Sequence, residues 1–503
     1  MSHSTEKSPC ASPRARAKGL KAFSLPADFW FKERDLKHAL AKMHLKKSVS
    51  SGSTPADSPR ASSKQPNLQF FQSFKVDPPG PDHFSQLSDE LLLQIFSKLP
   101  ISQHVSNSLV CKRWLYLHGR LVQSLNVTDW SFIESGRVFL RFPNLSDINI
   151  IRACFRTSKN SGILVTHKAL SVHVDTRVSS TNGFVDQIEN LLPSDLVDQG
   201  LELLAEKYPN LRRVVVIGAS ENGLLSIADE CHTLQELELH CCGDLSLKGI
   251  SVCQNLQVVK LIGSIDGFYS SVVSDIGLTI LAQGCRRLVK LELTGCEGSY
   301  DGIKAIGQCC QMLEELTLCD HRMDGGWLSA LTFCGNLKTL RLQLCKGIDS
   351  SPGLPQHLGS CLTLEELQLQ GCQLRDKQSV EALFLVCENV REIILQNCWG
   401  LEDDVFGLAS ICRRVKILSL EGCSLLTTGG LESVVLSWKE LQRLRVVSCN
   451  KIKDSEITPS LASLFSVLKE LKWRPDSRSL LSSGLAGTVV GKKGVRFFKG
   501  LKP

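Results

Sequence analysis

The segment CRRLVKLELTGC, Cys285–Cys296, contains the pattern that determines the fold of most of this chain. Written as C-x-x-L-x-x-L-x-L-x-x-C, the pattern returns with another apolar residue at either end in some copies. Apolar and polar residues alternate at its L-x-L centre, which predicts a short strand with one buried face. From Cys285 on, successive copies start 24 to 27 residues apart. A unit of that length cannot cover its own apolar face, so the units must stack on one another.

Stacked units of this kind predict a solenoid with the period of leucine-rich repeats. The L-x-L strands would line a concave side, and the segments after them, such as 403–412, have the apolar spacing of helices on the convex side. The expected fold class is therefore α/β, a horseshoe. Clear units begin at Cys231, Cys285, Cys310, Cys334, Cys361, Cys387, Cys412, Trp438 and Phe465, weaker units begin at Phe142, Tyr208 and Cys253, and a half-unit surrounds Leu125 and Val127.

A different pattern, FSQLSDELLLQIFSKLPISQHVSNSLVCKRW, occupies residues 84–114. Ser88 can cap a helix whose first turn carries Asp89 and Glu90, and Pro100 ends this helix. The apolar positions of the helix form a stripe too wide for packing against one neighbour. A segment of about 30 residues is too short to bury these side chains by itself, so other surfaces must cover part of the stripe.

Residues 84–114 resemble the F-box, the helical module by which substrate receptors of SCF ubiquitin ligases dock on a Skp-type adaptor. The resemblance rests on Leu87-Ser88-Asp89-Glu90-Leu91-Leu92-Leu93 with Ile95, Phe96 and Leu99, and on Val110-Cys111-Lys112-Arg113-Trp114. Ser88 stands where the family usually has proline. With the cysteine-bearing repeats, the whole is similar to ribonuclease-inhibitor-like, plant-type F-box proteins. The resemblance implies that the adaptor is bound by Leu87, Leu91, Leu92, Ile95, Leu99, Val110, Cys111, Lys112 and Trp114.

The predicted domains are a helical F-box at 83–130 and a solenoid at 131–474. Over-long units place insertions near 154–197 and 263–274. Residues 1–82 are rich in Ser, Pro and Lys and are expected to be mostly disordered. Within them, 23–45 could form a basic helix that docks on a partner or packs on the chain itself. Residues 475–503 form a basic tail, and the serines before proline at Ser8, Ser12 and Ser58 are candidate phosphorylation sites.

The positive charge of the chain belongs to its N-terminal tail. Of 58 Lys/Arg and 51 Asp/Glu, residues 1–82 hold 14 and 7, which leaves 44 of each in residues 83–503. A neutral body argues against broad nucleic-acid binding by the folded part. The sequence has no apolar run of about 18 residues and no signal-peptide core, so no membrane partner is expected. The expected location is the nucleus and/or the cytoplasm.

The 21 cysteines of the sequence are expected to be reduced packing residues. A spacing of 11 residues recurs within the units, as between Cys231 and Cys242, and assigns each cysteine a place in a repeat. Zinc ligands must instead converge on one point, commonly from close C-x-x-C pairs. No metal site and no cofactor are therefore expected, and the cysteines are interpreted as small buried hydrophobes.

A partner would be expected on the concave face, where the central residue of each L-x-L strand points away from the core. The middle strands are rich in amides and the last two are basic, so the basic end could hold an acidic or phosphorylated segment. An ordinary solvated strand face is the alternative. Candidate substrate-binding residues on this face and in the second insertion are Arg341, Gln343, Gln368, Gln370, Gln396, Arg443, Arg445, Lys472, Arg474, Phe268 and Tyr269.

These features predict a non-catalytic substrate-recognition subunit of an SCF-type E3 ubiquitin ligase. The resemblance implies that the F-box binds the Skp-type adaptor, and through it the cullin and RING subunits, while the repeats hold a protein substrate for ubiquitination and proteasomal degradation. No catalytic residues are expected, because the chemistry needs only positioning of the target by this chain. Two alternatives remain: a ligand-gated F-box receptor of the plant hormone type, suggested by the long loops, and a repeat scaffold that acts outside a ligase.

Overall fold

The computed structural model describes residues 83–155, 162–165, 170–173, 191–263, 273–354, 356 and 358–475. Residue contacts divide the chain into two units, 1–82 with 163–173, and 83–162 with 174–503. β3 (Gly162–Val165) and β4 (Leu170–His173), which apart from Gly162 belong to the first unit, pair as a two-stranded sheet. The predictions for 1–82, for 476–503 and for Phe268 and Tyr269 lie outside the described residues.

The second unit begins with a small helical module. It contains η2 (His83–Gln86), α2 (Asp89–Lys98), α3 (Ile101–Ser108) and α4 (Lys112–Leu121). The Ser88 side chain accepts a hydrogen bond from the Leu91 N–H at 3.4 Å, so the predicted cap is confirmed. Cys111 caps α4 in the same way through its sulfur. The module has its own core of Leu92, Phe96 and Leu117.

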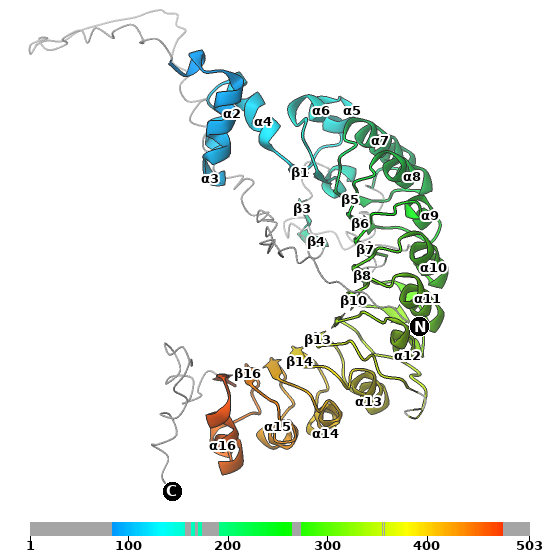
Figure 1. Ribbon diagram of the computed structural model, residues 1–503, viewed down its shortest axis with the longest axis vertical. Helices are drawn as coiled ribbons and strands as arrows, with labels where there is room; N and C mark the ends of the chain where they lie inside the picture. Colours follow the sequence, from blue (N-terminus) through cyan, green and yellow to red (C-terminus); the bar gives the residue numbers. More distant parts are fainter. Residues whose placement is uncertain are drawn as a thin grey trace, which may run out of the picture. The chain divides into compact units, whose positions relative to one another are not determined.

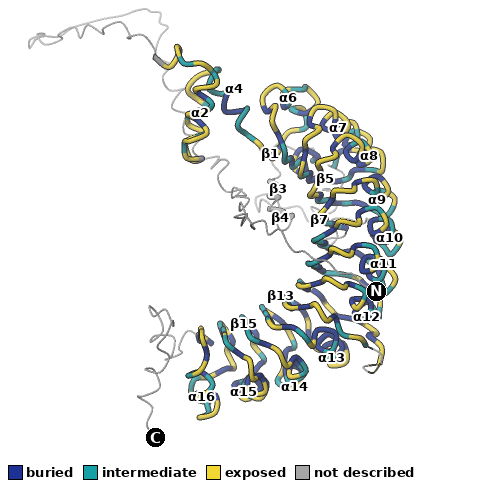
Figure 2. Tube along the Cα trace, in the orientation of Figure 1, coloured by how far each residue is buried: buried dark blue, intermediate teal, exposed yellow. Residues whose placement is uncertain are grey.

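A parallel sheet of 13 strands follows, with one strand for each unit and half-unit of the repeat (Figure 1). Helices on the outer side cover the sheet, and buried residues lie between the two layers (Figure 2). The predicted α/β solenoid is confirmed. Its strands are β1 (Ser124–Asn126), β2 (Asp147–Asn149), β5 (Arg213–Ile217), β6 (Glu236–His240), β7 (Val258–Ile262), β8 (Lys290–Thr294), β10 (Glu315–Cys319), β12 (Thr339–Gln343), β13 (Glu366–Gln370), β14 (Glu392–Gln396), β15 (Ile417–Glu421), β16 (Arg443–Val447) and β17 (Glu470–Arg474).

Short helices occupy most of the segments between these strands, as the apolar spacing predicts. Two very short strands, β9 (Glu297–Gly298) and β11 (Arg322–Met323), follow β8 and β10 along the chain and pair with each other in parallel. The helices are α5 (Ser131–Glu134), α6 (Arg137–Arg141), η3 (Ile151–Cys154), α7 (Ser194–Lys207), α8 (Glu221–Glu230), α9 (Ser246–Ile250), α10 (Asp275–Gly284), α11 (Tyr300–Cys309), α12 (Trp327–Ala330), η5 (Leu331–Phe333), α13 (Lys377–Val386), α14 (Asp403–Gly407), η7 (Leu408–Ile411), α15 (Thr428–Val435), η8 (Asp454–Glu456) and α16 (Pro459–Val467).

The leucines and cysteines of the repeat form the continuous core between the layers. In the unit quoted above, Cys285, Leu291, Leu293 and Cys296 are fully buried. The Cys296 thiol donates to the carbonyl oxygen of Leu261 in the preceding unit at 3.8 Å. Burial raises the pKa of Cys296 to about 12, so the thiol stays protonated and acts as a small packing group.

A carboxylate clamp also joins neighbouring units, and the sequence reading missed it. The Asp275 carboxylate accepts from the Ser299 N–H at 2.8 Å, from the Ser299 hydroxyl at 2.6 Å and from the Gly302 N–H at 3.0 Å. A Cβ at Gly302 would lie 2.3 Å from this carboxylate, so a larger residue does not fit. The pattern [ST]-x-x-G at the helix start is its signature, and equivalent clamps join Asp198 to Ser220, Asp244 to Ser274 and Asp403 to Thr427.

Two predicted boundaries differ from the structure. β1 already pairs in parallel with β2, so the solenoid begins inside the range 83–130 assigned to the F-box. Phe155 and Leu191, on either side of the first insertion, form an antiparallel bridge. Val197 lies within the predicted insertion 154–197, but it is fully buried on α7. The last residues of that range therefore belong to the repeat, because they complete its core.

The helical module packs directly on the first units of the solenoid. A Cβ at Gly119 on α4 would lie 2.0 Å from the carbonyl oxygen of Arg141 on α6, so the two backbones are in close contact. The Asn144 side-chain amide donates to the carbonyl oxygen of Arg120 at 2.8 Å. Because α4 ends at Leu121 and β1 begins at Ser124, no long linker separates the module from the sheet.

Candidate interaction surfaces

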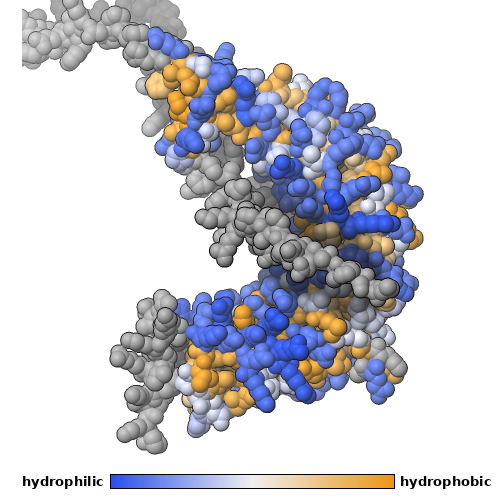
Figure 3. All heavy atoms as spheres, viewed as in Figure 1, coloured by the Kyte–Doolittle hydropathy of each residue, from blue (hydrophilic) through white to orange (hydrophobic). Residues whose placement is uncertain are grey.

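The helical module carries an exposed apolar surface opposite its packing on the solenoid core. Leu91 is 49% exposed, Val110 is 62% exposed and Leu109 is 75% exposed. Hydrophobic side chains are visible over this module at the top of Figure 3. So many exposed apolar residues within one small module are typical of a protein-binding site. The exposed apolar residues of the module are Phe84, Leu91, Ile95, Val105, Leu109, Val110 and Tyr116.

The predicted adaptor-binding residues fall into three groups: exposed, buried and partly buried. Leu91, Ile95, Val110, Cys111 and Lys112 are exposed and available to a partner. Leu92 is completely buried in the core of the module, so its prediction as a contact residue is corrected to a structural role. Leu91 and Leu92 differ in exposure because successive residues of a helix point to different sides of it.

Leu87, Leu99 and Trp114 are partly buried and pack against that same core. The Trp114 ring lies 4.8 Å from the Phe96 ring, edge to face. Their predicted contact with an adaptor stays a prediction. Phe84, Val105, Leu109 and Tyr116 were not predicted as contact residues, because exposure of an apolar side chain depends on how the three helices pack.

Arg113 organises the start of two helices. Its Nε donates to Asp89 Oδ1 at 2.8 Å, and its guanidinium also donates to the carbonyl oxygens of Leu87 and Phe84. These bonds tie the first turn of α4 to the first turn of α2, where Asp89 also favours the positive helix end. Arg113 is thus a structural residue of the module.

On the sheet, the predicted central residues form one continuous row. Parallel pairing places them in exact succession from strand to strand, for example Thr317 beside Arg341 and Gln368 beside Ile394. Most are only partly exposed, and Thr317 and Ser419 are buried. The full row is Glu238, Lys260, Glu292, Thr317, Arg341, Gln368, Ile394, Ser419, Arg445 and Lys472.

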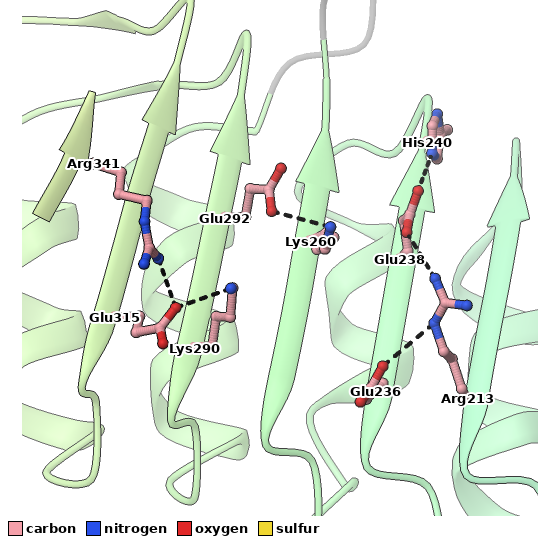
Figure 4. Close-up of polar contacts among 9 residues, drawn as sticks. All are labelled: Arg213, Glu236, Glu238, His240, Lys260, Lys290, Glu292, Glu315 and Arg341. Carbon is pink, nitrogen blue, oxygen red and sulfur yellow. Dashed lines mark hydrogen bonds and ion pairs between the residues drawn. The ribbon is translucent and has the colours of Figure 1, made fainter. Parts of the chain in front are cut away.

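The first half of this face is a network of ion pairs (Figure 4). Arg341 binds Glu315 at 2.7 Å, and Glu315 also binds Lys290 at 2.9 Å. Burial alone would raise the pKa of Glu315, but the hydrogen bonds from Lys290 and Arg341 outweigh it, so the pKa lies below its ordinary value. The charges of these strands are therefore satisfied within the face.

A similar cluster surrounds Glu238. Its carboxylate lies 3.4 Å from the Arg213 guanidinium and 3.0 Å from His240 Nε2. Burial alone would raise the pKa of Glu238, but the hydrogen bond from His240 and the neighbouring cations outweigh burial. The pKa therefore lies below its ordinary value, and the carboxylate stays ionised. Lys260 pairs with Glu292 on the next strands at 3.1 Å.

The end of the face is less basic than the sequence suggests. Arg445 pairs with Glu421 at 2.8 Å and Arg443 pairs with Glu470 at 3.6 Å. Among the described residues, Lys472 and Arg474 form no ion pair within 4.0 Å. Their role in holding an acidic segment stays a prediction, as does that of the amide row formed by Gln343, Gln370 and Gln396 in register.

Over the described ranges, His, Cys, Asp and Glu side chains do not cluster in threes that could hold a metal ion. The search for helices long and apolar enough to cross a membrane, made over the same residues, finds none.

Comparisons with known proteins agree with this division of the chain. A model of the F-box-like family matches residues 84–120. EEED8.10, a candidate RNA-binding protein of Caenorhabditis elegans, is 25% identical over 233 residues, which are 45% of this chain and 29% of that protein. The chain thus spans less than a third of this relative.

Solved structures with similar architecture overlap only in part. An internalin of Listeria monocytogenes matches with a TM-score of 0.33 and 13% identity, covering 56% of this chain and 80% of that one. The yeast Rad7 and Elc1 complex matches with a TM-score of 0.37 and 12% identity, covering 76% and 91%. The solenoid assignment rests instead on the strand register and the repeats of this chain. The chain therefore combines an F-box-like domain at residues 84–120 with an α/β solenoid that has the period of leucine-rich repeats.

Proposed function

We propose that this chain is the non-catalytic substrate-recognition subunit of an SCF-type E3 ubiquitin ligase. The exposed face of the helical module binds a Skp-type adaptor, and through it the cullin and RING subunits. The sheet face of the solenoid holds a protein target in the nucleus and/or the cytoplasm. The target is then ubiquitinated by the other subunits and degraded by the proteasome.

One observation carries this proposal: an F-box-like domain that exposes Leu91, Ile95, Leu109 and Val110 while its opposite side packs on the solenoid. Burying such side chains in a partner is favourable by about 25 cal/mol per Å² of apolar surface removed from water. The direct contact of α4 with α6 would let the adaptor and a target on the sheet be held at a defined separation, which is what a positioning subunit requires.

Adaptor capture by full-length variants tests the proposal. Leu91→Asp/Ile95→Asp puts two charges on the exposed surface without entering the core, and we expect at least about a tenfold loss of capture. Leu140→Asp is the matched control, because Leu140 is 75% exposed on α6, in the solenoid. Equal capture of the wild type and the double variant would refute docking through this face.

The same preparation separates the alternatives. If no cullin co-purifies with the wild type from cells, a repeat scaffold that acts outside a ligase would be favoured. Target capture that requires an added small molecule would favour a ligand-gated receptor. RNA binding is not carried over from the Caenorhabditis elegans relative, because residues 83–503 hold 44 Lys/Arg and 44 Asp/Glu.

A further inference from the structure

Two large apolar side chains stand exposed where β12 and β14 end. Leu344 follows β12 and is 60% exposed, and Trp399 lies three residues after β14 and is 65% exposed. The other described tryptophans are buried or partly buried. Exposed tryptophan is costly in water and is enriched at binding hot spots.

The backbone holds both residues firmly. The Leu344 N–H donates to the Gln370 carbonyl oxygen at 2.7 Å, although a φ of 54° is unfavourable for leucine. The Trp399 N–H donates to the Cys372 carbonyl oxygen at 2.8 Å, and the Trp399 carbonyl oxygen accepts from the Leu374 N–H at 2.7 Å. Side chains presented on a rigid backbone lose little freedom on binding.

Gly371 lies in the unit between them. It adopts a φ of 65°, and a Cβ there would lie 2.9 Å from Leu344 Cδ2. The Leu344 side chain therefore lies over the glycine of the next unit. Trp399 is level with the next residues of that unit, because it forms a parallel bridge with Gln373.

Two carboxylates lie at the other end of the same strands. Glu366 and Glu392 are directly opposite each other at the start of β13 and β14. Glu366 accepts from Thr339 Oγ1 at 3.2 Å and from the Gln368 amide, and no described cation lies within 4.0 Å of either carboxylate. Burial, and then the charge of Glu366, raise the pKa of Glu392, and the smaller effect of the Arg443 charge opposes them. Like charges directly opposite on paired strands repel, and a cation from a partner would relieve the repulsion.

Amides connect the two ends. Gln370 and Gln396 are paired in register and lie four residues beyond Glu366 and Glu392 on the same face. That separation is about 13 Å at 3.3 Å per residue. An amide offers both a donor and an acceptor, and so can pair with the backbone of an extended chain.

We propose that β13, β14 and the turns after β12 to β14 bind an extended protein segment that carries Lys or Arg about four to six residues from a large apolar side chain. The cation lies against Glu366 and Glu392, and the apolar side chain lies against Leu344 and Trp399. This inference rests on the proposed function, since it names the class of target segment. Charge complementarity favours a basic segment, because Glu366 and Glu392 stand at the starts of β13 and β14.

The test uses full-length protein and a series of fluorescein-labelled Gly/Ser peptides that carry one Arg and one Leu at increasing separation. Fluorescence anisotropy should give the tightest binding at a separation of about four to six residues. Trp399→Ala should weaken it at least about tenfold, and Glu366→Gln/Glu392→Gln by about three- to tenfold. Leu362→Ala is the control, because Leu362 is 77% exposed but lies before β13.

Binding that ignores the separation, that survives Trp399→Ala, or that prefers Glu to Arg in the peptide would overturn the inference. So would concentration-dependent self-association of the wild type that Trp399→Ala abolishes, because the occupant would then be a second copy. Adaptor capture is measured on the same proteins. Normal peptide binding with no adaptor capture by the wild type would refute the proposed function alone, whereas normal capture with no peptide binding would refute this inference alone.

Discussion

The helical module and the sheet of the solenoid expose opposite kinds of surface. The module leaves leucine, isoleucine and valine open to water around a core of three buried residues. The first half of the sheet face instead presents charges that already pair with one another, as Glu315 does with Lys290 and Arg341. An apolar surface gains free energy from any well-shaped apolar partner, while a paired polar surface gains only from a partner that replaces those pairs. The contrast suits one constant partner on the module and a selective one on the sheet.

Neighbouring leucines in the module give the largest expected effect. Leu92→Ala should destabilise α2 by about 2–5 kcal/mol, because it opens a cavity in a small core. Leu91→Ala should change the stability of α2 by no more than about 0.5 kcal/mol. Hydrogen exchange of the α2 amides measures both. Equal protection in the two variants would contradict the division between a core face and a binding face.

The clamp between solenoid units should give the next largest effect. Asp275→Ala removes the acceptor of three hydrogen bonds from Ser299 and Gly302, and we expect a loss of about 1–3 kcal/mol at α11. Exchange of the α11 amides reports the loss. Asp301→Ala is the control, because Asp301 is an exposed residue of the same helix. A similar loss in the control would show that helix charge matters more than the clamp.

Both regions contain a histidine whose pKa lies below its ordinary value, so both should weaken in acid. Burial lowers the pKa of His321 in the solenoid to about 4, and burial followed by the charge of His104 lowers the pKa of His118 in the module. As the pH falls below 6.5, the ordinary pKa of histidine, His321 becomes protonated in the unfolded chain. In the folded chain it stays neutral until about pH 4. Stability should therefore fall across this window by on the order of 1 kcal/mol per pH unit.

Unfolding free energies measured across that window check the histidine prediction. His321→Gln should reduce the pH slope, whereas His232→Gln should not, since His232 is exposed. An unchanged slope in His321→Gln would assign the acid sensitivity to other groups.

The ion pairs of the sheet should give the smallest effect. Glu315→Gln removes a partly exposed carboxylate from Lys290 and Arg341, and we expect a loss of about 0.3–1 kcal/mol that shrinks at high salt. Urea unfolding at two salt concentrations measures it. A loss as large as that of Asp275→Ala would mean that the face is held together by its charges and not by the core beneath.

Much of the fold follows from the spacing of residues along the chain. The repeat pattern predicted a strand for every unit from Leu125 to Trp473, because a period of two within a period of 24 to 27 leaves one way to bury the leucines. Ser88 and Pro100 predicted the ends of α2, because caps are local. The clamp aspartates were missed, since each bonds to a unit that is distant in sequence.

Which residues are exposed and which charges are paired could be known only from the tertiary structure. Leu91 and Leu92 are adjacent apolar residues of one helix, and only the packing of α4 on α2 buries the second and exposes the first. Arg443 and Arg445 look like a basic patch in the sequence, but Glu470 and Glu421 lie beside them on neighbouring strands. Trp399 is a large apolar residue of the kind usually found in a core, yet the turn after β14 leaves it exposed to solvent. Sequence by itself determined the repeat, because periodicity is a local property, while exposure and charge pairing depend on which units become neighbours in space.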